Sequence, residues 1–291
     1  MSDGATIRVR AHGNPNGRCV VLSHGNGFAI DGYIAFWREF LIDHNVVVFD
    51  LRNHGANPTD GGRRHHLDGM ADDLEALIQY VRARHEWTPL FGIFHSVSSI
   101  ATLWHAVNYP WAWDGLVLID PPIVPAPGHR LHERGFAMEM FLASWAIKRE
   151  QTFAHPDHLA DQLQRAKGLG RWAGDAFNDM ARATLVADNG AWRLSCPPAL
   201  EATGYISNAY TPVWAGLEAL RDVADRIFVV GGDPTMEGAW YPSEMGGELA
   251  SHFGIRHQSV PGTGHLPQLE QPNAVAASIR GFFKSLPPRL A

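Results

Sequence analysis

One serine lies where an apolar run turns into a helical pattern, and its hydroxyl could act as a nucleophile. Residues 90–94 predict a strand, and residues 97–107 predict a helix. A serine on such a sharp strand-to-helix turn presents its hydroxyl to a substrate carbonyl, as in the G-x-S-x-G pattern. Ser96 occupies the turn here, but Phe94 and Ser98 replace the two glycines. We expect Phe94 either to crowd the helix or to point into a neighbouring cavity, which would open the turn slightly.

The 16 histidines invite a metal site, but their spacing argues against one. The chain has no H-E-x-x-H pair and no C-x-x-C pair, which are the common ligand spacings. His65 and His66 follow a Gly-Gly-Arg-Arg stretch that is typical of a solvated turn. Isolated histidines are more often satisfied by ordinary hydrogen bonds than by a metal. We therefore expect no metal and no other cofactor.

Short apolar runs alternate with helical patterns along the chain, and this alternation predicts an α/β fold with a mostly parallel central sheet and crossover helices. An amphipathic helix is expected at residues 68–84, with apolar side chains at Leu74, Leu77, Ile78 and Val81. The expected strands are residues 18–23, 45–49, 90–94, 115–119 and 226–230, and residues 255–260 could add a further edge.

The pattern changes between residues 121 and 210. A proline-rich breaker cluster covers residues 121–127, and no strand-like run follows until Ile227. Helices are expected instead, at residues 132–148, 155–164, 175–186 and 198–206. Because strands resume afterwards, we expect a helical cap at residues 121–210 inserted into a core formed by residues 1–120 and 211–291. A separate helical domain is the alternative.

Composition limits the possible partners. The net charge is -6, with no polybasic run, so we expect neither nucleic acid nor an anionic membrane as a partner. Two cysteines, Cys19 and Cys196, cannot form a disulfide framework and favour a reducing compartment. The first residues have no apolar segment typical of a signal peptide, and no run approaches the roughly 20 apolar residues of a membrane span. The expectation is a cytoplasmic monomer or homodimer.

Five landmarks resemble, in order, those of the α/β-hydrolase superfamily, in its capped, esterase- or lipase-like branch of serine hydrolases. The resemblance covers nearly the whole chain. The landmarks are Leu22-Ser-His-Gly-Asn-Gly27, Phe49-Asp-Leu-Arg-Asn-His-Gly55, His95-Ser-Val97, Leu116-Val-Leu-Ile-Asp-Pro121 and Val260-Pro-Gly-Thr-Gly-His-Leu266. The α/β-hydrolase fold and a Ser-His-Asp triad are what this resemblance implies.

In that family the base follows the last strand, so the resemblance implies that His265 removes the proton of Ser96. It places the acid after the penultimate strand, at Asp233, which is preferred here. Asp120, at the tip of the preceding strand, is the alternative acid, and Glu237 is a more distant one.

The resemblance also implies an oxyanion hole made by the backbone N–H groups of Asn26 and Val97. The resemblance further implies that the turn at residues 50–54 has a structural role, in which it holds loops beneath the site. Trp145 is a candidate for the pocket wall because the inserted segment is rich in aromatic residues. Phe94 and Gly27 are further candidates, because Phe94 lies two residues before Ser96 and Gly27 follows Asn26.

These residues predict hydrolysis of a small ester, lactone or thioester with an apolar acyl or aromatic part, through an acyl-enzyme on Ser96. Because this fold hosts many chemistries, other functions stay open. A carbon-carbon bond hydrolase or a cofactor-free lyase or oxygenase could use the same serine and histidine. A non-catalytic receptor for a small ligand belongs to a different class.

Overall fold

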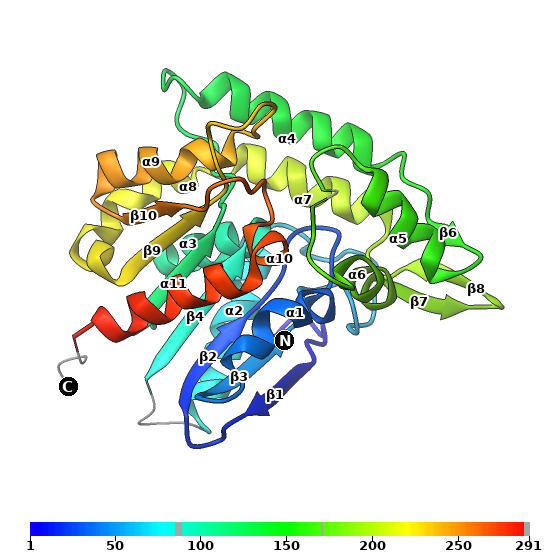
Figure 1. Cartoon of the computed structure of the whole chain (residues 1–291), viewed down its shortest axis with the longest axis horizontal. Helices are drawn as coiled ribbons and strands as arrows, with labels where there is room; N and C mark the ends of the chain where they lie inside the picture. The colour runs from blue at the N-terminus through cyan, green and yellow to red at the C-terminus, as the bar shows by residue number, and fades with distance from the viewer. Residues whose placement is uncertain (85–88, 170, 288–291) are drawn as a thin grey trace.

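A seven-stranded sheet lies at the centre of the molecule, which we describe from a computed structural model covering residues 1–84, 89–169 and 171–287 (Figure 1). The strand order is β1-β3-β2-β4-β5-β9-β10. β1 runs antiparallel to β3, and all other neighbouring pairs are parallel. The strands are β1 (Val9–Gly13), β2 (Arg18–Leu22), β3 (His44–Phe49), β4 (Leu90–His95), β5 (Gly115–Ile119), β9 (Ile227–Gly231) and β10 (Arg256–Ser259).

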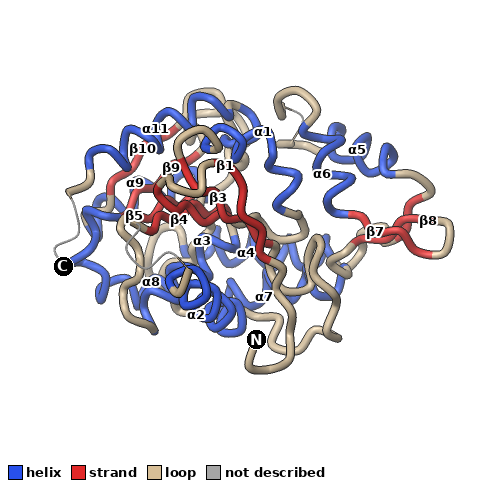
Figure 2. The backbone as a smooth tube through the Cα atoms, turned by 90° about the horizontal axis from the view of Figure 1, so that it is seen from below, coloured by secondary structure: helices blue, strands red, loops and turns tan. Residues whose placement is uncertain are grey.

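The inner strands are buried because helices cover both faces of the sheet (Figure 2). On one face lie α2 (Leu67–Arg82), α3 (Val97–Asn108) and α9 (Pro242–Phe253). On the other face lie α1 (Ile34–Trp37) and α11 (Pro272–Ser285). The shorter elements are the 3-10 helices η1 (Ile30–Tyr33), η2 (Arg38–Phe40) and η3 (Leu217–Arg226), with the helices α8 (Val213–Gly216) and α10 (Pro267–Glu270).

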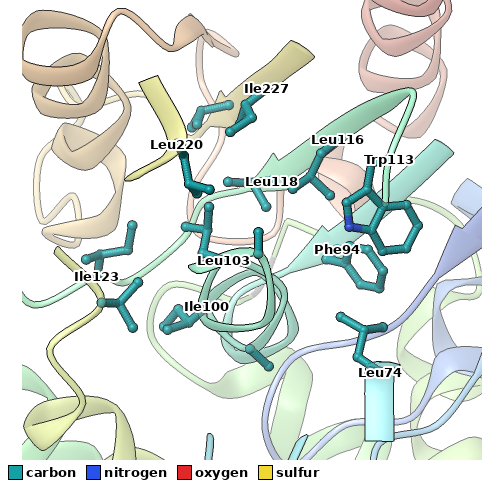
Figure 3. Close-up of a cluster of buried hydrophobic side chains, with 14 of the residues drawn as sticks. Leu74, Phe94, Ile100, Leu103, Trp113, Leu116, Leu118, Ile123, Leu220 and Ile227 are labelled. Carbon is teal, nitrogen blue, oxygen red and sulfur yellow. The ribbon is translucent and has the colours of Figure 1, made fainter. Parts of the chain in front are cut away.

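Phe94 belongs to the core between the sheet and its helices, which corrects its expected place in the pocket wall. Its ring is fully buried and lies edge-on to Trp113, with ring centroids 5.5 Å apart. Figure 3 shows Phe94 between Trp113 and Leu74, on the face covered by α2 and α3. Gly92 leaves the space for the ring, because a Cβ there would lie 2.7 Å from a carbon of Phe94. The side chain therefore fills the core without entering a substrate cavity.

The segment between β5 and β9 leaves the sheet and forms a layer at one end of it (Figure 1). Its helices α4 and α7 pack side by side, and α5 packs on α6. The four helices are α4 (His132–Ala146), α5 (Pro156–Arg165), α6 (Ala176–Thr184) and α7 (Pro198–Tyr210). They match the four helical stretches expected there, although α6 ends before residue 186.

This layer also contains three strands that the sequence did not predict. β6 (Thr152–Phe153), β8 (Ala191–Leu194) and β7 (Leu185–Asp188) form a small antiparallel sheet. A two-residue turn at Asn189-Gly190 joins β7 to β8, and both residues have positive φ angles, 48° and 83°. An Asn-Gly pair of this kind is typical of a β-hairpin, and it is the signal that the helical interpretation of residues 175–186 missed.

The other strands agree with the expectation, except that β1 was not foreseen. β1 is only partly buried and pairs on one side alone, so its sequence lacks the apolar run of an inner strand. Within the described ranges, none of the helices is both long and apolar enough to cross a membrane.

Candidate active site

Ser96 lies on a strained turn between β4 and α3. Its backbone angles are φ 53° and ψ -121°, a conformation that few non-glycine residues adopt. The neighbouring Ser98 replaces the second glycine of the usual pattern, and its side chain helps to hold the turn. Its hydroxyl donates to the carbonyl of His95 at 2.9 Å and accepts from the His95 N–H at 3.0 Å. The departures from the G-x-S-x-G pattern therefore leave a sharp turn with the serine at its tip.

Three side chains from three loops form a continuous hydrogen-bonded chain at this turn. The Ser96 hydroxyl lies 3.1 Å from Nε2 of His265, and Nδ1 of His265 lies 2.6 Å from Oδ2 of Asp120. A carboxylate only accepts hydrogen bonds, so Nδ1 of His265 carries the proton and Nε2 is free to accept the serine proton. The arrangement has the connectivity of a Ser-His-Asp triad.

The backbone conformation and the hydrogen bonds of Asp120 fix the position of its side chain. The residue directly follows β5, its φ angle is 43°, and its side chain is fully buried. Its second oxygen, Oδ1, accepts a hydrogen bond from the backbone N–H of Gly232 at 3.0 Å. Both carboxylate oxygens thus have a donor, which fixes the carboxylate plane against His265.

Asp233, the preferred acid, does not contact His265, and this preference is corrected in favour of Asp120. Its Oδ1 accepts from the backbone and hydroxyl of Thr235 at 2.9 and 2.6 Å, and its Oδ2 accepts from the N–H of Gly262 at 2.9 Å. The bond from Gly262, followed by those from Thr235, lowers the pKa of the Asp233 carboxyl. The side chain therefore braces the loop that carries His265.

The loop after β2 leaves one backbone donor free near Ser96. The N–H of Gly25 donates to the hydroxyl of Tyr33, and the N–H of Gly27 donates to Nε2 of His54. In the described part of the chain, the N–H groups of Asn26 and Val97 have no acceptor. Val97 begins α3, where unpaired N–H groups and the helix dipole favour negative charge. These are the two donors expected for an oxyanion.

Gly25 lets this loop approach the turn at Ser96. A Cβ on Gly25 would lie 2.8 Å from Nδ1 of His95 and 3.3 Å from the Cβ of Ser96. Any side chain at this position would displace one of these two residues.

The turn after β3 holds the loops beneath the site, as expected. Asp50 accepts from the N–H groups of Ile30 and Ala56 at 2.7 and 3.0 Å. Arg52 forms two 2.7 Å bonds with the carboxylate of Asp73. Burial lowers the pKa of His54 to about 3, so its neutral ring can accept the N–H of Gly27. These contacts give the charged residues of this buried turn a structural role that is separate from the hydrogen-bonded chain of Ser96.

A cavity of about 620 Å³ opens beside Ser96 and His265 and is walled by the inserted layer. Most of its lining is apolar. Many of the apolar residues come from α4, α5, the loop after α5 and the residue before α10, and they include Met138, Phe141, Leu142, Trp145, Leu159, Leu163, Leu169 and Leu266. Trp240 also lines it and stacks on the ring of His265, with centroids 5.6 Å apart. Among the described residues, Trp145 lines the cavity as expected, whereas Gly27 lies outside its wall, beneath the carboxylate of Glu201.

The polar groups of the cavity carry little net charge. Glu139 is almost fully buried, and burial raises the pKa of its carboxyl to about 8, so it is largely neutral at pH 7. The Arg149 guanidinium pairs with the Glu201 carboxylate, and both side chains are mostly buried. Glu150 and Lys167 also line the cavity, and their formal charges are opposite. With a neutral Glu139 and a paired Arg149 and Glu201, the cavity carries little net charge and favours neutral groups along its apolar wall.

Sequence reasoning missed several of these residues. Trp240, Glu139 and the Arg149–Glu201 pair lie far from any recognisable motif, and only the fold brings them to the cavity. Tyr33 was also missed, and His95 was noted only as the first residue of the His95-Ser-Val97 landmark.

Two groups of side chains in the described ranges could offer three ligand atoms to a metal. One is His54, His65 and Cys196, and the other is His129, Glu248 and His252, with the ligand atoms of each group within 4.8 Å of one another. Neither group includes Ser96, His265 or Asp120.

Comparison with known proteins gives the same picture of the fold. A family model described as the alpha/beta hydrolase family matches residues 20–278. Esterase YbfF of Escherichia coli strain K12 is 27% identical over 275 residues, which cover 94% of this chain and 96% of that protein.

Two solved structures share the fold at low identity. E-2-(acetamidomethylene)succinate hydrolase superposes with a TM-score of 0.76 at 17% identity, covering 97% of this chain and 96% of the other. A carboxylesterase of Nitrososphaera gargenis superposes with a TM-score of 0.73 at 16% identity, covering 98% and 96%. With most of its length matched by the family model and its sheet shared with these structures, the chain belongs to the alpha/beta hydrolase family.

Proposed function

We propose that this protein is a serine esterase that hydrolyses an ester, thioester or lactone with an apolar acyl or aromatic part. The observation that carries the proposal is the hydrogen-bonded chain from Ser96 through His265 to Asp120 at the edge of an apolar cavity. The 27% identity with an esterase over nearly the whole chain supports hydrolase activity.

In the first half of the proposed reaction, the Ser96 oxygen bonds to the substrate carbonyl carbon while its proton passes to Nε2 of His265. The carbonyl oxygen becomes an oxyanion, which accepts from the N–H groups of Asn26 and Val97. Asp120 stabilises the positive charge on His265 and holds its ring in place. The bond to the leaving oxygen or sulfur then breaks, and the leaving group takes the proton from His265.

The second half repeats these steps with water. Water gives its proton to His265 and bonds to the acyl carbon, and the bond from that carbon to the Ser96 oxygen then breaks. The Ser96 oxygen recovers the proton from His265. The net products are a carboxylic acid and an alcohol or thiol, and the protein returns to its starting state.

The cavity supports the choice of acyl part. A volume of about 620 Å³ falls within the range of sites for small organic molecules. Its apolar wall favours alkyl or aryl groups, and a charged acyl group would lose hydration against that part of the wall. We also propose that residues 121–210 act as a cap, because α4, α5 and α7 supply much of this wall.

Rapid mixing with p-nitrophenyl butyrate tests the proposal. We expect a burst of p-nitrophenolate close to one equivalent of protein when deacylation is the slower half, and no burst from Ser96→Ala. We also expect p-nitrophenyl hexanoate to be cleaved with a higher kcat/KM than the p-nitrophenyl monoester of succinic acid. Tight ligand binding with no turnover of any ester would instead favour a receptor.

A further inference from the structure

A second buried hydrogen-bonded chain joins the loop after β2, the turn at Ser96 and the loop that carries His265. The N–H of Gly25 lies 3.1 Å from the hydroxyl of Tyr33, which lies 2.8 Å from Nδ1 of His95. Nε2 of His95 lies 3.0 Å from the backbone carbonyl oxygen of His265. Tyr33 and His95 are at most 2% exposed.

The direction of every bond in this chain can be assigned. A carbonyl oxygen only accepts, so Nε2 of His95 must carry a proton and donate to His265. Burial, followed by the nearby ring of His265, lowers the pKa of His95 well below its ordinary value, so the ring is neutral and Nδ1 accepts. Tyr33 therefore donates to Nδ1, and its oxygen accepts from Gly25.

The chain connects the parts whose mutual distances control the reaction. Gly25 precedes Asn26, whose N–H is the proposed oxyanion donor, and His95 precedes Ser96. The carbonyl at the other end belongs to His265 itself. The Ser96–His265 bond of 3.1 Å is long enough that a small shift of the histidine loop would break it.

Resting on the function proposed above, we propose that Tyr33 and His95 are positioning residues that hold the oxyanion loop, the nucleophile turn and the His265 loop in one reactive arrangement. Tyr33 lies outside the cavity wall, and His95 borders the cavity but is only 1% exposed, so the loss of their bonds should lower kcat and leave KM nearly unchanged. Because misplacing a catalytic group by about 1 Å can slow a reaction about 100-fold, the effect should be measurable even though the fold survives.

Three variants each remove a different set of hydrogen bonds from this chain. Tyr33→Phe removes only the hydroxyl and leaves Gly25 N–H and His95 Nδ1 without partners, so we expect kcat to fall about tenfold. His95→Leu removes both bonds of the ring, and we expect a loss of about 30-fold or more. His95→Gln can still donate from its Nε2 to the His265 carbonyl, so kcat should recover to within about fivefold of the original. KM should stay within about twofold in all three.

Ser99→Ala is the matched control for lost stability. The Ser99 hydroxyl is fully buried and donates to the Phe94 carbonyl at 2.6 Å, so its removal also breaks a buried hydrogen bond next to the same turn. It has no bond to the chain from Gly25 to His265, and kcat should stay within about twofold. The double variant Tyr33→Phe/His95→Leu should be no slower than His95→Leu by more than about twofold, because both break one chain.

Nitrogen-15 NMR of histidine-labelled protein gives a readout that does not depend on activity. We expect His95 to be protonated at Nε2 and not at Nδ1 at pH 7, and the Nδ1 signal to shift in Tyr33→Phe. If His95→Leu fails to fold, Tyr33→Phe and this spectrum still test the proposal.

The proposal is overturned if His95 is protonated at Nδ1, or if Tyr33→Phe and His95→Leu lose stability like Ser99→Ala but keep their kcat. Failure of the proposed function is distinct, because the original protein would then neither hydrolyse esters nor react with a fluorophosphonate at Ser96. In that case the NMR assignment alone decides whether the chain of bonds exists.

Discussion

Replacing Asp120 by asparagine tests which carboxylate supports His265. The two oxygens of Asp120 accept from two N–H donors, the backbone of Gly232 at 3.0 Å and Nδ1 of His265 at 2.6 Å. Asparagine has one oxygen and one NH2 group. If its oxygen stays on Gly232, its NH2 group faces Nδ1 and forces that nitrogen to accept, so the proton moves to Nε2. In that form His265 can no longer accept the proton of Ser96.

The opposite orientation of the asparagine would keep the reactive form of His265, but it places two donors against each other at Gly232, which is unfavourable in a fully buried position. The unreactive form of His265 is therefore expected to dominate. The corresponding change in a Ser-His-Asp protease lowers kcat about 10⁴-fold, and we expect Asp120→Asn to lower kcat for p-nitrophenyl butyrate by about 10³- to 10⁴-fold.

Asp233→Asn is the matched control, since the side chain differs by the same atoms and only the loop contacts of Thr235 and Gly262 change. We expect its kcat to stay within about fivefold, because the asparagine oxygen can still accept from Thr235. Steady-state kinetics at pH 8 with both variants gives the comparison. A loss of several orders of magnitude in Asp233→Asn, with Asp120→Asn nearly as active as the original, would refute the assignment.

Three further variants test the pocket, the close approach of the loops and the core. Because burial raises the pKa of Glu139 to about 8 from an ordinary 4.5, the folded chain binds more protons than the unfolded chain between these pH values, and stability falls as the pH rises through that window. In urea unfolding, Glu139→Gln should therefore be more stable than the original at pH 8, by up to a few kcal/mol. The difference in the free energy of unfolding should shrink toward pH 4.5. A difference of zero at both pH values would contradict a buried, neutral Glu139. Gly25→Ala places a Cβ 2.8 Å from His95, so kcat/KM should fall about 100-fold, whereas Gly247→Ala, with no atom within 4 Å of its Cβ, should keep its activity. Phe94→Leu should lower the free energy of unfolding by about 1–2 kcal/mol through a small core cavity and leave kcat/KM within about twofold; a changed preference among acyl chain lengths would instead place Phe94 at the pocket.

Strands, helices and site residues that have a characteristic local sequence pattern could be predicted from the sequence alone. The buried parallel strands read as apolar runs, and the helices around them follow their amphipathic spacing. Ser96 could be found because it lies at the turn between a strand pattern and a helix pattern. His265 could be found because it directly follows the Gly-Thr-Gly turn at residues 262–264. The expected pairing of these two side chains agrees with their 3.1 Å separation.

The choice of acid could not be made from the sequence, because two aspartates follow neighbouring strands. Asp120 follows β5 and Asp233 follows β9, and both strand ends lie near the histidine loop. What separates them is backbone geometry. Asp120 has a positive φ and turns into the buried space beside Gly232, whereas Asp233 turns toward Thr235 and Gly262. Neither orientation leaves a signal in the residue types.

The pocket was predictable only in its general character. An insertion rich in aromatic residues indicated an apolar cavity, and Trp145 does line it. Phe94 and Gly27 were misplaced because their distance along the chain from Ser96 and Asn26 says nothing about which face of the strand or loop they occupy. Phe94 points to the core face of β4, and Gly27 lies beneath Glu201 from α7.

The central claim is that Ser96 carries the acyl group during turnover, and mapping a covalent adduct tests it most directly. The protein is treated with a fluorophosphonate, digested and sequenced by mass spectrometry, with Ser96→Ala and His265→Ala treated in parallel. We expect one adduct, on Ser96 in the peptide that contains His95, with none in Ser96→Ala and far slower modification in His265→Ala. An adduct on another residue, or none on a protein that still hydrolyses p-nitrophenyl butyrate, would contradict the account.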